Sequence, residues 1–335
     1  MPIKRKEKPH SDFFVETSYT IVVPDQDLLA RLCGTNDSNL HLIEKYLGVP
    51  VFTQGNEVSL GKADDQIIRQ FQHIVDRITD EAAAGFDVGP DLMASILQLN
   101  QDGQSPEDFR DCGIIISGAV KKVYPKTTNQ LRLVKALRSS DMVFCIGPAG
   151  SGKTFLMMAE ALRLVLDGQV RSLVLTRPVV EAGESLGYLP GDLEQKINPY
   201  LRPLFDVINT LLPTGFGKRL MESGVIEVAP LAYMRGRTLN NSVILLDEAQ
   251  NTTREQMKMF LTRMGEGSKV FVTGDITQID LPRRTPSGLV HCLEILKDIP
   301  EISMITMESS DVVRNELVRK IVQAYEDSKN EENWN

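Results

Sequence analysis

Residues 147–154 read Gly147-Pro148-Ala149-Gly150-Ser151-Gly152-Lys153-Thr154 and match the phosphate-binding pattern G-x-x-x-x-G-K-[ST]. The apolar run Met142–Ile146 precedes them and the helix-forming run Phe155–Leu162 follows, which predicts a strand, a loop and a helix in that order. Glycines let such a loop turn its backbone N–H groups toward phosphates, and the helix N-terminus adds positive potential. We therefore expect these eight residues to hold the phosphates of a nucleotide.

Two side chains of this loop and two acidic residues further on predict a metal-dependent site. Lys153 is expected to bridge the β- and γ-phosphates, and the Thr154 hydroxyl to take a place on Mg²⁺. The apolar run 242–246 ends in Asp247-Glu248, which in a parallel sheet emerge at the edge that carries the loop. We expect Asp247 to hold Mg²⁺ through water, and Glu248 to orient or deprotonate the attacking water. The alternative is an ordinary strand-to-turn transition.

A third apolar run, Lys269–Thr273, leads into Gly274-Asp-Ile-Thr-Gln278. A polar group at this point lies opposite the γ-phosphate and is able to sense whether the phosphate is present. Gln278 is the better candidate, because a neutral amide both donates to phosphate and accepts from water. The alternative is a simple turn.

Five apolar runs alternate with helical patterns in the second part of the chain and predict a parallel sheet covered on both faces. They are Met142–Ile146, Ser172–Thr176, Val243–Leu246, Lys269–Thr273 and Ile302–Met307. We predict an α/β P-loop NTPase domain over residues 121–326, including a helix at 312–325, and a charged tail at 327–335.

The first part of the chain predicts a smaller α+β domain over residues 15–83, after a flexible basic arm at 1–14. Its element order, βααββα, resembles a KH domain, in which a GxxG loop clamps a nucleic-acid backbone. Here that loop is Gly34-Thr-Asn-Asp37, and Asp37 puts a negative charge where phosphates are expected. A protein-interaction domain is the alternative. Residues 84–120, with one short helix at Leu92–Leu99, are predicted to be a linker.

Composition sets outer limits on function. The 335 residues carry a net charge of −8, which excludes a protein that is basic all over, so any contact with nucleic acid must come from local clusters. The four cysteines are scattered without metal-binding spacing, as in a reducing compartment. The start of the chain lacks the apolar region of a secretory signal, and no run is long enough for a membrane helix. We expect a cytoplasmic protein with no membrane partner.

Several stretches together resemble the PhoH-like protein family of P-loop ATPases, which are relatives of superfamily 1 helicases. The resemblance covers about residues 120–325. It rests on residues Val143–Thr154, Thr176–Gly191, Tyr233-Met-Arg-Gly-Arg-Thr238, Ile244–Lys258 and Val272–Pro282. It implies a RecA-like sheet, ATP and Mg²⁺ as ligands, ATP hydrolysis and a connection with RNA metabolism.

The resemblance also gives meaning to two further residues. Pro125-Lys-Thr-Thr-Asn-Gln130 resembles a Q-motif, in which Gln130 reads the adenine edge. The alternative is a capped helix start, since Thr127 or Thr128 followed by Gln130 suits a helix N-terminus. Glu308–Arg314 resembles the family's closing motif, although Asn315-Glu316 stands where the family usually has His-Pro.

Superfamily 1 helicases place ATP between two RecA-like domains, and the second domain supplies an arginine to the γ-phosphate. This chain has sequence for only one such domain, so we expect a neighbouring subunit to complete the site, and the resemblance implies a hexameric ring. An arginine of this kind contributes 10³–10⁵ in turnover. The candidates, in order, are Arg314, then Arg283 or Arg284, then Arg235 and Arg237.

Three functions remain after this reading. The first is an ATPase that remodels RNA or ribonucleoprotein, with an RNA helicase as one form of it. RNA contact is then expected at the loops 177–191 and 233–238, although these loops suit subunit contacts equally well. The second is a nucleotide-switched adaptor or scaffold that regulates a protein partner such as a ribonuclease. A small-molecule kinase ranks last, because the acidic pair and Gln278 follow a water-activating plan.

Overall fold

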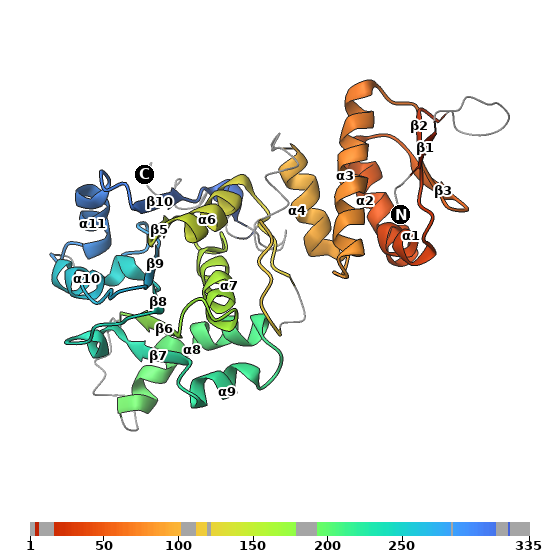
Figure 1. Cartoon of the computed structure of the whole chain (residues 1–335). Helices are drawn as coiled ribbons and strands as arrows, with labels where there is room; N and C mark the ends of the chain where they lie inside the picture. Colours follow the sequence, from red (N-terminus) through yellow and green to blue (C-terminus); the bar gives the residue numbers. More distant parts are fainter. Residues whose placement is uncertain are drawn as a thin grey trace, which may run out of the picture. The chain divides into compact units, whose positions relative to one another are not determined.

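The structure, a computed structural model, describes residues 4–6, 17–101, 112–118, 122–178, 193–282, 284–312 and 321. The chain divides into a small unit, residues 1–115 and 120–131, and a larger P-loop unit, residues 116–119 and 132–335. Figure 1 colours the small unit red to orange and most of the P-loop unit green to blue. Within the described part, every helix is too short or too polar to span a bilayer.

The small unit is built on a four-stranded antiparallel sheet with strand order β1-β2-β4-β3. The strands are β1 (Lys4–Lys6), β2 (Tyr19–Val22), β3 (Val51–Gln54) and β4 (Glu57–Leu60). From β2 onward the elements follow the βααββα order that the sequence predicts. The basic arm differs from the prediction of a flexible segment, because Lys4–Lys6 pairs with β2 as an edge strand.

Three helices cover this sheet. They are α1 (Gln26–Cys33), α2 (Ser38–Leu47) and α3 (Asp65–Ala83). Asp64 caps helix α3, because its carboxylate accepts the backbone N–H groups of Gln66 and Ile67 and so satisfies two donors of the first turn. Its apolar face enters the core with Phe71, Ile74, Val75 and Ile78, all completely buried.

The predicted linker contains part of this core. Helix α4 (Pro90–Gln101) buries Leu92, Met93 and Ile96 in the same apolar cluster as α3. The cluster also takes in Val88, before the helix, and Tyr124, well after it. Much of the range 84–120 is therefore structural, because its apolar residues complete the small unit's core, whereas residues 102–111 and 119–121 lie outside the described part.

The loop at the GxxG position keeps an unusual backbone. It forms a 3₁₀ turn, η1 (Thr35–Asp37), in which Asn36 has a φ of 53° and Asp37 a φ of 57°. Both angles lie in the left-handed region, which Asn and Asp tolerate better than other residues with a Cβ. Asp37 thus occupies a conformation that glycine adopts without strain.

The P-loop unit contains a six-stranded, fully parallel sheet with strand order β10-β5-β9-β8-β6-β7. The sequence predicts its parallel character and five of its strands. Its strands are β5 (Met142–Ile146), β6 (Ser172–Arg177), β7 (Ile226–Pro230), β8 (Ser242–Leu246), β9 (Lys269–Gly274) and β10 (Ile302–Thr306). Every residue of β8 is buried, which fits a central strand covered on both faces.

Among the described residues, six helices accompany the sheet. They are α6 (Thr128–Ser139), α7 (Lys153–Leu166), α8 (Leu193–Leu211), α9 (Phe216–Glu222), α10 (Arg254–Leu261) and α11 (Gly288–Leu296). In Figure 1, α10 and α11 lie on one side of the sheet and α7 on the other. Met257 of α10 and Leu289 of α11 belong to the core cluster that includes Phe144 and Ile244 of the strands.

Strand β7 is absent from the sequence-based expectation. It lies at an edge of the sheet, is buried at only part of its length and ends at Pro230, so it lacks the continuous apolar run that marks the central strands. The predicted helix 312–325 and tail 327–335 lie outside the described residues, apart from Val312 and Ile321.

Candidate nucleotide-binding site

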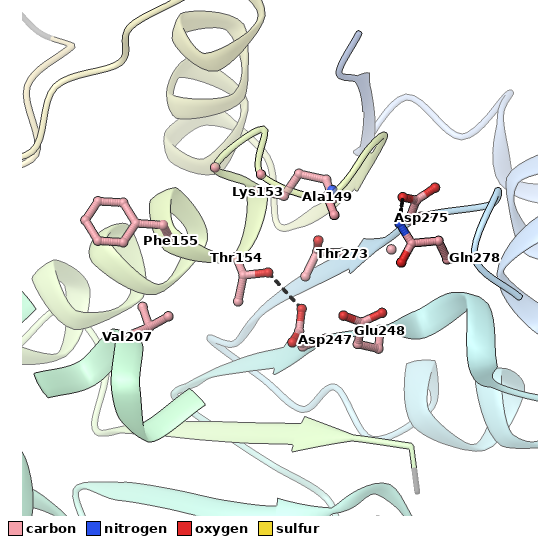
Figure 2. A pocket seen from close by; sticks show the side chains of 13 residues that line it. Ala149, Lys153, Thr154, Phe155, Val207, Asp247, Glu248, Thr273, Asp275 and Gln278 are labelled. Atoms are coloured by element: carbon pink, nitrogen blue, oxygen red, sulfur yellow. Dashed lines mark hydrogen bonds between the residues drawn. The ribbon is translucent and has the colours of Figure 1, made fainter. Parts of the chain in front are cut away.

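Three predicted motifs meet at one edge of the parallel sheet. The P-loop follows β5, Asp247-Glu248 follows β8, and the segment 274–278 follows β9, which lies between these two strands. Together they line a cavity of about 270 Å³ (Figure 2). The lining residues are Ala149, Gly150, Gly152, Lys153, Thr154, Phe155, Val207, Asp247, Glu248, Thr273, Gly274, Asp275 and Gln278.

The P-loop holds its lysine close to its own backbone. The Lys153 ammonium donates to the carbonyl oxygens of Gly147 at 2.7 Å and Pro148 at 2.8 Å. Gly147 has a φ of 146°, and a Cβ there would lie 2.5 Å from the carbonyl oxygen of Met307, so only glycine fits. Burial lowers the pKa of Lys153 from its ordinary value, while neighbouring acidic groups oppose that shift. The buried ammonium therefore depends on local acceptors.

The predicted metal ligands lie together. The Thr154 hydroxyl donates to Oδ1 of Asp247 at 2.8 Å, although the two residues are far apart in the sequence (Figure 2). Burial raises the pKa of Asp247, and Arg177 opposes this rise. A hydroxyl and a carboxylate beside a phosphate loop suit Mg²⁺, which prefers oxygen ligands and keeps several of its waters.

An unsatisfied hydroxyl supports the same reading of the cavity. Thr273 at the end of β9 is 1% exposed, and its Oγ1 has no hydrogen-bond partner within the described structure. Figure 2 shows Thr273 between the P-loop and Asp247. A buried hydroxyl without a partner is costly, so this oxygen fits a site that a bound ligand or its water completes.

Glu248 is fixed by two residues that the sequence analysis did not identify. Its Oε1 lies 3.0 Å from Nη2 of Arg177, and its Oε2 accepts a hydrogen bond from Nε2 of Gln250 at 2.5 Å. The Glu248 backbone has a φ of 54°, a left-handed value that is strained for a residue with a Cβ. Two features of the sequence could have pointed to these partners. Arg177 is a cation at the end of an apolar run, and Gln250 is an amide two residues after Glu248.

Gln250 also connects the acidic pair to the segment after β9. Its Oε1 accepts from the backbone N–H of Asp275 at 3.0 Å, and its Nε2 lies 3.2 Å from the carbonyl oxygen of Gln278. The Gln278 side chain lines the cavity and donates to Oδ2 of Asp275 at 2.9 Å. The predicted sensing residue therefore lies in the cavity, beside the base.

Comparison with known proteins identifies the family of this chain. The family model described as PhoH-like protein matches residues 122–326. The chain belongs to the PhoH-like protein family. A PhoH-like protein of Mycobacterium tuberculosis is 48% identical over 302 residues, which cover 89% of this chain and 85% of that protein. A PhoH-like protein of Bacillus subtilis is 44% identical over 309 residues, 90% of this chain and 95% of that protein.

The similarity to these PhoH-like relatives extends beyond the range of the family model and so reaches outside the P-loop unit. By contrast, Protein PhoH of Escherichia coli is 45% identical over 198 residues, 58% of this chain and 56% of that protein. Among solved structures, the Pif1 helicase from Candida albicans aligns with a TM-score of 0.30 at 16% identity, covering 55% of this chain and 39% of that one. The six-stranded parallel sheet, with the P-loop after β5 and the acidic pair after β8, is a P-loop NTPase fold.

Gln130 of this PhoH-like chain has a capping role in the structure. Its backbone N–H lies 3.2 Å from Oγ1 of Thr127, and its Oε1 accepts from the backbone N–H of Lys126 at 2.6 Å. These bonds satisfy donors at the start of α6, which is the alternative that the sequence left open. The adenine contact of Gln130 stays a prediction.

The arginines proposed to act on a neighbouring subunit fall into three groups. Arg314 and Arg283 lie outside the described residues. Arg237 is paired with Glu227 through two contacts of 2.6 and 2.7 Å, and a phosphate contact would have to replace this pair. Arg235 and Arg284 are exposed at the surface. These two therefore remain candidates among the described residues.

Proposed function

We propose that this PhoH-like protein binds ATP with Mg²⁺, hydrolyses the bond between the β- and γ-phosphates, and uses the reaction to remodel RNA or ribonucleoprotein. The observation that carries the ATPase proposal is the contact of 2.8 Å between the Thr154 hydroxyl and Asp247, with Glu248 and Gln278 lining the same cavity. The convergence of these residues supports the proposal, because phosphoryl transfer requires a phosphate loop, metal ligands and a residue that orients water in one place.

The cavity has a polar end and an apolar end. Glu248 and Gln278 lie toward one end in Figure 2, and Phe155 and Val207 lie toward the other. The γ-phosphate belongs at the end with the acidic pair, where water must be activated. The adenosine then extends toward Phe155, which follows Thr154 directly on α7, and toward Val207 of α8.

In this arrangement each residue has a defined task. Lys153 exchanges the carbonyl oxygens of its own loop for phosphate oxygens and follows the negative charge that develops during transfer. Thr154 and Asp247 would hold Mg²⁺, which would supply positive charge to stabilise the phosphates during transfer. Glu248 orients the attacking water and accepts its proton, while Gln278 contacts the γ-phosphate.

Substitution of the base tests the chemistry directly. Glu248→Gln keeps an oxygen for Gln250 but cannot accept a proton, so turnover should fall by about 10² to 10⁴ while ATP still binds. Lys153→Ala should instead lose ATP binding, since the loop loses its only side-chain cation. Steady-state hydrolysis and equilibrium binding of a labelled ATP separate the two effects. Normal hydrolysis by Glu248→Gln would refute the assignment of the base.

A surface at the same edge of the sheet supports the RNA part of the proposal. After β7, the turn η3 (Leu231–Met234) anchors Leu231 and Met234 in the core, and Tyr233 between them is 50% exposed. Arg235 follows and is exposed as well. An exposed aromatic ring and an exposed guanidinium two residues apart suit a single-stranded RNA, through base stacking and phosphate contact.

Hydrolysis measured with and without single-stranded RNA tests this part. We expect RNA to stimulate turnover at least about tenfold, and the stimulation to fade as salt rises, because phosphate contacts release counterions. Tyr233→Ala should reduce the stimulation and leave basal turnover unchanged, because Tyr233 is exposed and has no part in the hydrolysis itself. Stimulation by a protein partner in place of RNA would favour the adaptor or scaffold function.

The proposal includes a site shared between subunits. The described residues around the cavity come from one sheet and its helices, and a second wall is expected from a neighbouring copy, in a hexameric ring. Mixing Lys153→Ala subunits with Arg314→Ala subunits should restore part of the ATPase activity if Arg314 acts in trans. A mixture as inactive as both parents would refute sharing through Arg314 and direct attention to Arg235 and Arg284.

A further inference from the structure

Arg177 is the last residue of β6 and meets three groups with three different nitrogen atoms. Its Nη2 lies 3.0 Å from Oε1 of Glu248, its Nε lies 4.0 Å from Oδ2 of Asp247, and its Nη1 donates to the carbonyl oxygen of Tyr200 at 3.1 Å. The side chain is only 20% exposed. The planar guanidinium thus joins both carboxylates of the acidic pair to helix α8.

The sheet explains why Arg177 reaches the acidic pair. Strand β6 pairs with β8 in a register that places Thr176 opposite Leu246, and the N–H of Asp247 donates to the carbonyl oxygen of Thr176 at 3.0 Å. The next residue of each strand therefore emerges at the same edge. A cation at this position offsets the repulsion between two adjacent carboxylates.

The side chain of Glu248 is held in place by other side chains, while its backbone lies in a strained region. Its left-handed φ of 54° places it between the end of β8 and the 3₁₀ turn η4 (Ala249–Asn251). The Arg177 side chain holds one oxygen of the Glu248 carboxylate, and the Gln250 side chain holds the other. Strained residues at functional sites persist where the surroundings determine their position.

Resting on the proposed function, we propose that Arg177 is a positioning residue for ATP hydrolysis: it holds Glu248 in the orientation that activates water and ties the acidic pair to α8. Arg177 itself is not among the residues that line the cavity, so it acts through Glu248. Helix α8 carries both the Tyr200 carbonyl and Val207 of the cavity wall. The arginine thereby connects the wall of the nucleotide site with its base.

Turnover of Arg177→Met tests the proposal, since methionine keeps an apolar stem and removes the charge and all donors. We expect kcat to fall about 10- to 100-fold, the usual cost of losing a group that orients a reacting residue. KM for ATP should change less than about threefold, because binding contacts remain. Arg171→Met is the matched control at the opposite, exposed end of β6, and it should behave as the parent protein.

The double variant Arg177→Met/Glu248→Gln separates positioning from general structural damage. If Arg177 acts through Glu248, its loss should have no further effect once the base is gone. The inference would be overturned if Arg177→Met lowered turnover by the same factor with Glu248 and with Gln at position 248. It would also be overturned if Arg177→Met kept full activity while Glu248→Gln was inactive. Normal hydrolysis by Glu248→Gln would instead refute the proposed base, which keeps the two failures distinct.

Arg177→Lys provides a second measurement, including the case in which Arg177→Met does not fold. Lysine keeps the charge but offers one nitrogen in place of three, so turnover between those of Arg177→Met and the parent protein is expected. The turnover of Arg177→Lys is also compared with and without the Glu248→Gln substitution. A lysine variant whose loss is equal in both backgrounds would also overturn the inference.

Discussion

In the small unit, the buried carboxylate of Glu81 has all its partners within the protein: Arg77 at 2.8 Å, Lys122 at 3.0 Å and the Tyr124 hydroxyl at 2.8 Å. In the P-loop unit, the buried ammonium of Lys153 is held by the carbonyl oxygens of its own loop. The two charged residues are buried to a similar extent, with exposed fractions of 4% for Glu81 and 7% for Lys153. We call the Glu81 set closed because charged and hydroxyl side chains hold its carboxylate, although Lys122 and Tyr124 also line a cavity of about 210 Å³. We call the residues around the P-loop cavity the open set, because neutral carbonyl oxygens of its own loop hold the Lys153 ammonium and the Thr273 hydroxyl has no partner in the described structure.

The difference separates a structural role from a functional one. Burial and the bond to Glu81 raise the pKa of Tyr124, so its hydroxyl stays a donor and the Glu81 set remains complete. Around the cavity, Thr273 keeps an unpartnered hydroxyl and Glu248 a strained backbone. A charged cluster that is complete stabilises a fold, and one that is incomplete points to a ligand.

The largest effect is expected in the closed set. Lys122→Met leaves the carboxylate of Glu81 with one cation fewer inside the core of the small unit, so the free energy of unfolding should fall by about 3–5 kcal/mol. ATP turnover per folded molecule should stay at the parent level. Chemical denaturation, followed by an assay at a temperature where the variant is folded, measures both. A large loss of turnover in the folded variant would contradict the structural reading.

Lys153→Met is the matched change in the open set. It removes the cation that we propose to face the phosphates, so turnover should fall by about 10² to 10³. The free energy of unfolding should change by less than about 1 kcal/mol, because the change also ends the burial of a charge held only by its own loop. Comparing denaturation curves of the two methionine variants decides the matter. Equal destabilisation would mean that Lys153 is structural too.

The sequence predicts this open set well because the P-loop motifs are tied to local chain geometry. A strand, a glycine-rich turn and a helix fix the P-loop, and an apolar strand that ends in Asp247-Glu248 fixes the acidic pair. Their meeting follows from parallel strands, whose carboxyl ends share one edge. The order of the sheet, with β9 between β5 and β8, comes from packing and is visible only in the structure.

The sequence does not predict the side-chain contacts between the ends of neighbouring strands. Arg177 and Gln250 reach Glu248 because of strand register, and neither belongs to a spacing pattern. Gln130 shows a different difficulty, since one short pattern suits both adenine recognition and helix capping, and the structure shows the capping bonds. Strand β7 escapes because an edge strand needs no continuous apolar run.

Thr273→Val sharpens the comparison with a smaller expected effect. Valine has nearly the same shape, and the hydroxyl it removes has no partner in the described structure, so stability should be unchanged or slightly higher. If this hydroxyl meets the bound nucleotide or its metal-bound water, turnover should fall about tenfold. Thr176→Val is the control, because Thr176 is equally buried, its Oγ1 also lacks a partner, and it lies outside the cavity lining. Equal behaviour of the two variants would remove Thr273 from the site.

The smallest effect is a pH dependence that belongs to the open set alone. Burial raises the pKa of Asp247, against the lowering influence of Arg177. Protonated Asp247 is neutral and holds a cation poorly, so the Mg²⁺-dependent part of ATP affinity should decrease as pH falls through this raised pKa. Below it, the decrease approaches about tenfold per pH unit, as expected for one proton.

ATP itself also takes up protons in this range, so the quantity to measure is a ratio. Dividing the ATP affinity of the parent protein by that of Asp247→Asn, both with Mg²⁺ present, cancels the protonation of the nucleotide. The ratio should decrease toward one as pH falls, and it should begin to do so above the range in which an exposed aspartate titrates. A ratio that stays constant until that ordinary range would mean that burial does not govern Asp247. The open set would then differ from the closed set in its unpartnered Thr273 hydroxyl, and not in the effect of burial on the pKa of its carboxylate.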